Sequence, residues 1–150
     1  MANLKTNNKY RIIRYPSECL ATVCEEVADG DTSAIDNFSR FKASCLINKG
    51  VAVAAPQLGI TLRYFYFRFD NESFMAINPK INSVSEGSES AFEGCLSIPG
   101  KVCQIERYAS LNWSYTDQNG ARWNEDASGW KARIIQHEID HLNGICIADK

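Results

Sequence analysis

The chain has 150 residues, of which 45% are hydrophobic and 23% charged, the length and balance of one soluble globular domain. A formal net charge of −2 gives no broad positive surface, so neither nucleic acid nor an anionic membrane is expected as a partner. Residues 1–10 lack the apolar core of a signal peptide, and no apolar run approaches a membrane span. We therefore expect a single catalytic domain over residues 1–150, located in the cytoplasm.

Six cysteines are spread along the chain, at positions 19, 24, 45, 95, 103 and 146. Without a secretory signal they are expected to stay reduced, since a buried free cysteine packs as a small hydrophobic side chain. At most one or two of these thiols should carry chemistry.

The first predicted element is a helix over residues 31–48, where apolar side chains recur at helical spacing. Asp31 or Thr32 can cap its start, and Gly50 can follow its end as the left-handed C′ residue.

A block of strands follows this helix. Residues 62–69 are dense in aromatic side chains and predict a strand that is apolar on both faces. Asn78-Pro79 is expected to break a second extended segment, and Asn119-Gly120 to form a two-residue hairpin turn. Further strands are predicted at residues 95–98, 102–105 and 111–115.

The last predicted helix runs from about Ser128 to Leu142, with Asp126 or Ser128 as N-cap and Gly144 just beyond its end. Strands in a block between two helices indicate an α+β fold. We expect mixed or antiparallel strands packed around this C-terminal helix, with one helix near the N-terminus.

The final helix carries the pattern H-E-x-x-H at residues 137–141. His137 and His141 lie one turn apart on one face, so both imidazoles can reach one metal ion. Glu138 projects near the same face and can take a proton from water. The pattern also occurs by chance in structural helices, but these are the only two histidines of the chain, which favours a metal site.

The same helical wheel predicts the surroundings of the two histidines. Trp130 and Ile134 share the metal face, and Ile135, Ile139 and Leu142 form a second apolar stripe. The helix should therefore be largely buried, with its metal face toward an apolar pocket. The remaining side of the wheel holds Arg133, Gln136, Asp140 and Asn143.

A catalytic metal site needs a third protein ligand and an open position. In thermolysin-like proteases a downstream glutamate supplies that ligand, but no glutamate follows His141 here. The candidate is Cys95, which lies upstream between Gly94 and Leu96. On its own, Cys95 fits a packing role better than a ligand role.

Three segments together resemble the peptide deformylase family. Residues 50–57 (GVAVAAPQ) are similar to its G-x-G-x-A-A-x-Q motif, residues 93–97 (EGCLS) to E-G-C-L-S, and residues 136–141 (QHEIDH) to Q-H-E-x-D-H. Their order and rough separation also agree, and the resemblance extends from about Ile12 onward. A single motif would be weak, but three in order are specific.

The resemblance implies removal of the formyl group from the N-terminal formylmethionine of nascent polypeptides. It implies one divalent metal ion, natively Fe²⁺, with Zn²⁺, Ni²⁺ or Co²⁺ as substitutes, held by Cys95, His137 and His141. Glu138 would activate the attacking water and pass its proton to the leaving amine. Gln57 and the backbone N–H of Leu96 would bind the oxyanion of the tetrahedral intermediate.

The methionine side chain of such a substrate needs an apolar pocket beside the metal. Gly50, Val51, Trp130 and Ile134 are the candidates, and plain core packing is the alternative for each. Arg107 is expected either to pair with Asp140 and steady the ligand helix, or to be a solvated charge. Glu93 could likewise be a surface charge or orient its neighbours.

Two features depart from the family pattern. Ala52 replaces the second glycine of the first motif, which matters if the backbone there needs a positive φ. The sequence ends at Lys150, as in short forms encoded by bacteriophages, so ribosome docking through a further C-terminal helix is not expected. A monomer is expected.

Two other functions compete with deformylation. A zincin-like endopeptidase would use the same helix pattern, but it lacks the downstream ligand and does not explain the cysteine motif. A non-catalytic metal-binding domain would have no need for Glu138 and Gln57, and would want a fourth protein ligand.

Overall fold

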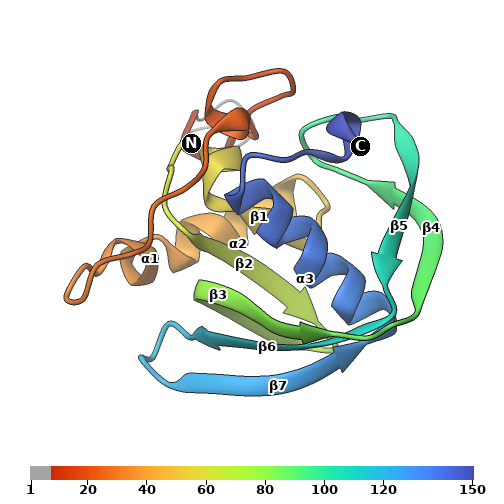
Figure 1. The fold of residues 1–150 in the computed structure, drawn as a ribbon. Coiled ribbons are helices and arrows are strands. Elements are labelled where there is room, and N and C mark those ends of the chain that lie inside the picture. The colour runs from red at the N-terminus through yellow and green to blue at the C-terminus, as the bar shows by residue number, and fades with distance from the viewer. Residues whose placement is uncertain (1–7) are drawn as a thin grey trace.

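The computed structural model describes residues 8–150, so most of the N-terminal segment considered for a signal peptide lies outside it. Figure 1 shows helix α3 (Gly129–Leu142) between a five-stranded antiparallel sheet and a separate pair of strands. The five-stranded sheet has the order β1-β2-β3-β6-β7 and the pair is β4-β5. The strands are β1 (Ala52–Ala54), β2 (Tyr64–Phe69), β3 (Glu72–Val84), β4 (Ser88–Gly94), β5 (Val102–Tyr108), β6 (Ser110–Thr116) and β7 (Arg122–Ser128). This confirms the expected α+β class.

Both faces of the sheet are covered at β2, which explains the dense apolar sequence of that strand. Successive side chains of β2 point to opposite faces. Phe65 and Phe67 therefore pack in the cluster with α3, whereas Tyr64 and Tyr66 pack in the cluster with helix α2 (Phe38–Ile47). All four are buried, so the prediction of a strand apolar on both faces is confirmed.

Helix α3 is fixed at both ends by glycines in the left-handed region. Ser128 occupies the N-cap position in extended conformation without a side-chain cap bond, and Gly129 follows with φ 59°. Gly144 has φ 76° just past the helix end, as predicted. A β-carbon on Gly144 would lie 2.7 Å from the carbonyl oxygen of Ala21, so this residue also lets the helix end approach the N-terminal segment.

The predicted helix over residues 31–48 is wrong in two details. It is divided into α1 (Ser33–Asp36) and α2, because Asn37 turns between them and its side chain bonds back to the carbonyl of Ser33. The left-handed residue after α2 is Lys49 (φ 58°) and not Gly50. The N–H of Gly50 instead bonds to the carbonyl of Cys45, which completes a Schellman motif.

Three expectations about strands are corrected as well. Residues 95–98 form a turn after β4, closed by a bond from Ile98 N–H to the carbonyl of Cys95, because the chain must reverse into β5. Asn78 does not end its strand: β3 continues through a bulge there, and the Asn78 amide pairs with the backbone of Val27. Five residues (117–121) separate β6 from β7, where a two-residue turn was predicted, and only Gly120 among them is left-handed (φ 81°).

The six cysteines are all free thiols, as expected. Within residues 8–150, no helix has the length and apolar character needed to cross a bilayer.

Candidate active site

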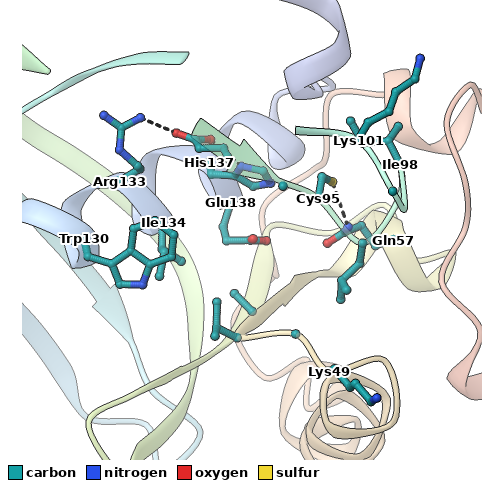
Figure 2. A pocket seen from close by; sticks show the side chains of 17 residues that line it. Lys49, Gln57, Cys95, Ile98, Lys101, Trp130, Arg133, Ile134, His137 and Glu138 are labelled. Atoms are coloured by element: carbon teal, nitrogen blue, oxygen red, sulfur yellow. Dashed lines mark hydrogen bonds and ion pairs between the residues drawn. The ribbon is translucent and has the colours of Figure 1, made fainter. Parts of the chain in front are cut away.

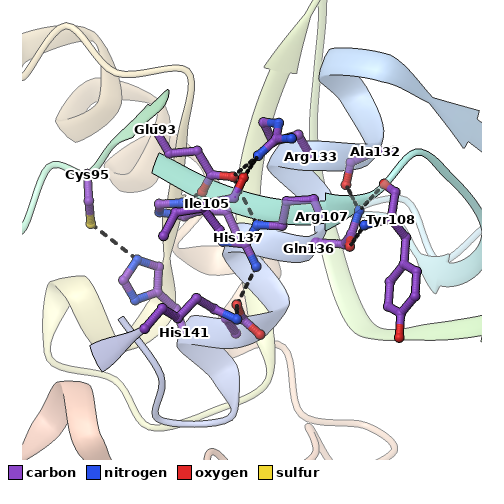
Figure 3. A network of polar contacts seen from close by, with 12 residues as sticks. Glu93, Cys95, Ile105, Arg107, Tyr108, Ala132, Arg133, Gln136, His137 and His141 are labelled. Carbon is purple, nitrogen blue, oxygen red and sulfur yellow. Dashed lines mark hydrogen bonds and ion pairs between the residues drawn. The ribbon is translucent and has the colours of Figure 1, made fainter. Parts of the chain in front are cut away.

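The structure brings the three predicted ligands together. Cys95 lies directly after β4, and His137 and His141 lie one turn apart on α3 (Figure 3). One ligand atom from each residue lies within 4.8 Å of the other two. The Cys95 Sγ is 3.4 Å from Nε2 of His141. A strand end and a helix face, distant in sequence, therefore supply one potential metal site.

The chemistry of these donors fits a divalent cation. Nδ1 of His137 contacts Glu93 Oε1 at 2.8 Å, which leaves Nε2 toward the site. Burial, followed by the positive charges of His137 and Arg107, lowers the pKa of His141 to about 3, so its imidazole is neutral. One thiol and two imidazoles suit Zn²⁺, Fe²⁺, Co²⁺ or Ni²⁺ better than Mg²⁺ or Ca²⁺.

Cys146 is a neighbour of this site that the sequence did not reveal. It is buried in a cluster with Ile98 and Ile105, against Cys95. Its hydrogen bond, together with burial, raises the pKa of the Cys95 thiol. Coordination to a cation acts in the opposite direction, since a coordinated thiol loses its proton.

Glu138 lies between the ligands and the pocket, with its carboxylate aimed into the site (Figure 2). It is only 4% exposed, and among residues 8–150 no group hydrogen-bonds to its Oε2. Burial raises the pKa of Glu138 to about 7. A carboxyl group with such a pKa can both accept and return a proton near neutral pH.

Gln57 is held in one orientation by its neighbours. Its Oε1 accepts a 2.9 Å bond from the N–H of Ala54, and its Nε2 donates to Ser97 Oγ at 3.1 Å. Ser97 in turn donates to the carbonyl of Ile13 at 2.7 Å. This anchoring directs the amide nitrogen of Gln57 toward Cys95, 3.7 Å away. Ser97 thus fixes this donor.

Leu96 and Gly50 approach closely at the edge of the same site. A β-carbon on Gly50 would lie 2.7 Å from Cδ1 of Leu96, so any side chain at position 50 would require the Leu96 side chain to shift. Within residues 8–150, the backbone N–H of Leu96 donates no hydrogen bond. It is therefore available as a donor.

A cavity of about 370 Å³ opens beside these groups. All four predicted pocket residues line it, namely Gly50, Val51, Trp130 and Ile134. Ile134 is buried in the wall, whereas Trp130 is 54% exposed at the rim. The walls are mainly apolar, and His137 and Glu138 also line the cavity (Figure 2).

Ala52 does not disturb this arrangement. It lies in β1 opposite Phe67 and is not among the residues with positive φ. The methyl group therefore causes no backbone strain where the family motif has glycine.

Glu93 is a buried hub of hydrogen bonds and not a surface charge. It is 3% exposed and accepts two bonds from Arg107, one from Arg133 and one from His137 (Figure 3). Burial alone would raise the pKa of Glu93, but the bonds from Arg107 and His137 outweigh it and hold the pKa well below its usual range. Arg107 also binds Asp140, so the expected pair exists.

The remaining side of the α3 wheel is partly buried as well. Arg133 and Gln136 are each 6% exposed, because β4 and β5 cover that side of the helix. The amide of Gln136 bonds to both the N–H and the carbonyl of Tyr108 in β5. A wheel of one helix does not reveal a second sheet that packs against it.

Comparison with known proteins agrees with this geometry. Residues 9–150 match the family model of polypeptide deformylase. A peptide deformylase of Treponema pallidum is 40% identical over 132 residues, which cover 88% of this chain and 82% of that protein.

Solved structures with high similarity include two deformylases. The crystal structure of the peptide deformylase from Thermotoga maritima has a TM-score of 0.89 and 35% identity, covering 94% of this chain and 96% of that one. A probable peptide deformylase from Synechococcus phage S-SSM7 has a TM-score of 0.87 and 29% identity, covering 93% and 97%. The resemblance to short phage forms is thus confirmed. The chain belongs to the polypeptide deformylase family and is a metal-dependent hydrolase that removes the N-formyl group from nascent peptides.

Proposed function

We propose that Cys95, His137 and His141 hold one divalent cation, natively Fe²⁺, and that residues 1–150 act as a single catalytic domain. The observation that carries this proposal is the convergence of the three donor atoms within 4.8 Å, beside a buried carboxylate. Zn²⁺, Ni²⁺ and Co²⁺ are the substitutes that this donor set accepts. When bound, the ion acts as a Lewis acid toward the formyl oxygen and lowers the pKa of water.

Glu138 is proposed as the general base and then the general acid. It takes a proton from the water that attacks the formyl carbon and delivers it to the nitrogen of the departing amine. Its raised pKa of about 7 supports both transfers, because neither protonation state is strongly disfavoured near neutral pH.

Gln57 and Leu96 are proposed as the oxyanion donors. Attack on a formamide carbon places negative charge on its oxygen, which fixed N–H groups stabilise. The anchored amide of Gln57 and the free N–H of Leu96 flank Cys95 and meet this requirement without moving at the moment of reaction.

The methionine side chain of the substrate is proposed to occupy the cavity formed by Gly50, Val51, Trp130 and Ile134. The exposed rim at Trp130 leaves room for the nascent chain to continue into solvent. We further propose a cytoplasmic monomer without nucleic acid or membrane partners. Ribosome docking through a further C-terminal helix is not part of this proposal.

The test is an anaerobic assay of the protein loaded with Fe²⁺ or Ni²⁺. We expect the protein to release formate from a formyl-Met tripeptide. We also expect it to leave unmodified casein uncleaved. Metal-loaded, folded protein that releases no formate would refute the proposal. Cleavage of casein would favour a zincin-like endopeptidase.

A further inference from the structure

We propose that Arg133 is a positioning residue that holds His137 in its ligand orientation through Glu93. This inference rests on the proposed metal site. Each oxygen of Glu93 is bound by two donors. Oε1 accepts hydrogen bonds from Nη2 of Arg107 at 2.9 Å and from Nδ1 of His137 at 2.8 Å. Oε2 accepts hydrogen bonds from Nε of Arg107 at 2.9 Å and from Nη1 of Arg133 at 2.7 Å. The carboxylate therefore cannot turn away from His137 without breaking bonds to both arginines.

The two arginines differ in the carboxylates that they bind. Arg107 divides its guanidinium between Glu93 and Asp140. For Arg133, Glu93 is the one carboxylate partner within the described chain, and its other bonds go to backbone carbonyls. Arg133 is thus the cation committed to Glu93. An ionised, doubly anchored Glu93 in turn keeps the proton of His137 on Nδ1 and the lone pair on Nε2.

Arg133 also joins the metal helix to both strands of the small sheet. It donates to the carbonyl of Ile105 in β5 at 2.8 Å and to that of Glu89 in β4 at 2.7 Å. Because β4 ends just before Cys95, the same guanidinium sets the position of the strand that carries one ligand and of the carboxylate that orients another. Its side chain is 7% exposed, so water competes little for these bonds.

A lysine or an apolar chain cannot reproduce this arrangement. The planar guanidinium presents several donors in fixed directions, and here it serves three acceptors on two strands. A lysine at position 133 can reach Glu93 with a single ammonium group. It would retain the charge but lose the geometry.

The test compares Arg133→Met and Arg133→Lys with wild type, and uses Arg122→Met, on the exposed face of β7, as a matched control. Co²⁺ affinity is measured by chelator competition, and the visible absorption of bound Co²⁺ reports the ligand geometry. We expect Arg133→Met to lose on the order of 10- to 100-fold in Co²⁺ affinity and to shift the absorption bands. Arg133→Lys should recover part of the affinity, and Arg122→Met should match wild type.

The outcomes separate the two proposals. A wild-type protein that binds no Co²⁺ would refute the metal site itself. Wild-type affinity and spectrum in folded Arg133→Met would overturn the role of Arg133 alone, even if its urea midpoint fell. If Arg133→Met does not fold, wild-type affinity and spectrum in Arg133→Lys would overturn the role in the same way, because that variant lacks the fixed donors.

Discussion

Glu93 Oε1 and His137 Nδ1 lie 2.8 Å apart, and this contact links the buried ion-pair network of the small sheet to the metal face of α3. Since Nδ1 is engaged, Nε2 is the nitrogen that remains for a cation. Glu93 immediately precedes Gly94 and Cys95, so one short segment provides a ligand and the residue that orients a second ligand. The site is therefore assembled by two elements that fix each other.

Replacement of Gln57 by glutamate tests the oxyanion donor. The glutamate side chain keeps an oxygen that can accept the bond from the N–H of Ala54 but offers no N–H to the oxyanion. We expect kcat for formate release to fall on the order of 10²- to 10³-fold, with metal content unchanged. Ser97→Ala removes the anchor of the amide, together with the bond from Ser97 Oγ to the carbonyl of Ile13, but leaves the amide in place, so it should lose less. Wild-type kcat in Gln57→Glu would exclude this role.

Metal removal should lower both activity and stability. Ligands that converge only in the folded chain make the cation bind the native state, which stabilises it by about 2.7 kcal/mol at a hundredfold excess over Kd. Chelation is therefore expected to abolish formate release and to lower Tm, and added Ni²⁺ to restore both. Cys95→Ala should show a much smaller metal-dependent shift in Tm. An identical shift in that variant would contradict the assignment of Cys95.

Asp117 should make the stability of the β6–β7 hairpin depend on pH. Asp117 is 8% exposed, and burial alone would raise its pKa. Hydrogen bonds from Trp123, Asn119 and Ala121 outweigh burial and lower the pKa of Asp117 below its ordinary value of 3.8. The stabilisation that the ionised Asp117 carboxylate provides is thus fully present above pH 3.8. It is lost as the pH falls through the lower, folded-state pKa.

The variant Asp117→Ala measures this contribution. We expect it to lose about 1–3 kcal/mol of unfolding free energy at pH 7, measured by urea denaturation. The difference in unfolding free energy between wild type and Asp117→Ala should shrink as the pH falls below 3.8. A difference that stays constant down to pH 2 would show that the ionised carboxylate is not responsible.

Gly144→Ala should destabilise the end of α3 through a steric contact. The added methyl group would meet the carbonyl of Ala21 at 2.7 Å, in a residue with φ 76°. Gly30→Ala is a matched control, because Gly30 has φ 84° and no atom within 4 Å of the β-carbon position. Left-handed strain costs about 1–3 kcal/mol in either variant. The urea midpoint of Gly144→Ala should be clearly lower than that of Gly30→Ala. Equal midpoints would show that the backbone at Ala21 moves to accommodate the methyl group.

Much of the fold and site was predictable because the decisive patterns are local. The spacing of His137 and His141 places both on one helix face, and the aromatic run of β2 requires a sheet buried on both sides. Gly144 marks the end of α3 because a left-handed residue is needed there. Such features depend on periodicity and backbone conformation, which a sequence displays directly.

The remaining features depend on contacts between distant segments. Arg133 and Gln136 are polar and fall on the outer side of the helical wheel, yet β4 and β5 bury both. Glu93 likewise becomes a buried hub only because two arginines from β5 and α3 meet it. The turn at Cys95 was mistaken for a strand, since alternation of apolar residues does not show where a chain reverses.

The most direct test of the account is metal-quantified formate release by Glu138→Ala beside wild type, under anaerobic conditions with a formyl-Met tripeptide. We predict that both proteins bind one equivalent of metal and that the variant is slower on the order of 10²- to 10⁴-fold, as expected for loss of a general base. Equal rates at equal metal content would contradict the account, because the buried carboxylate beside the three ligands would then have no part in the chemistry.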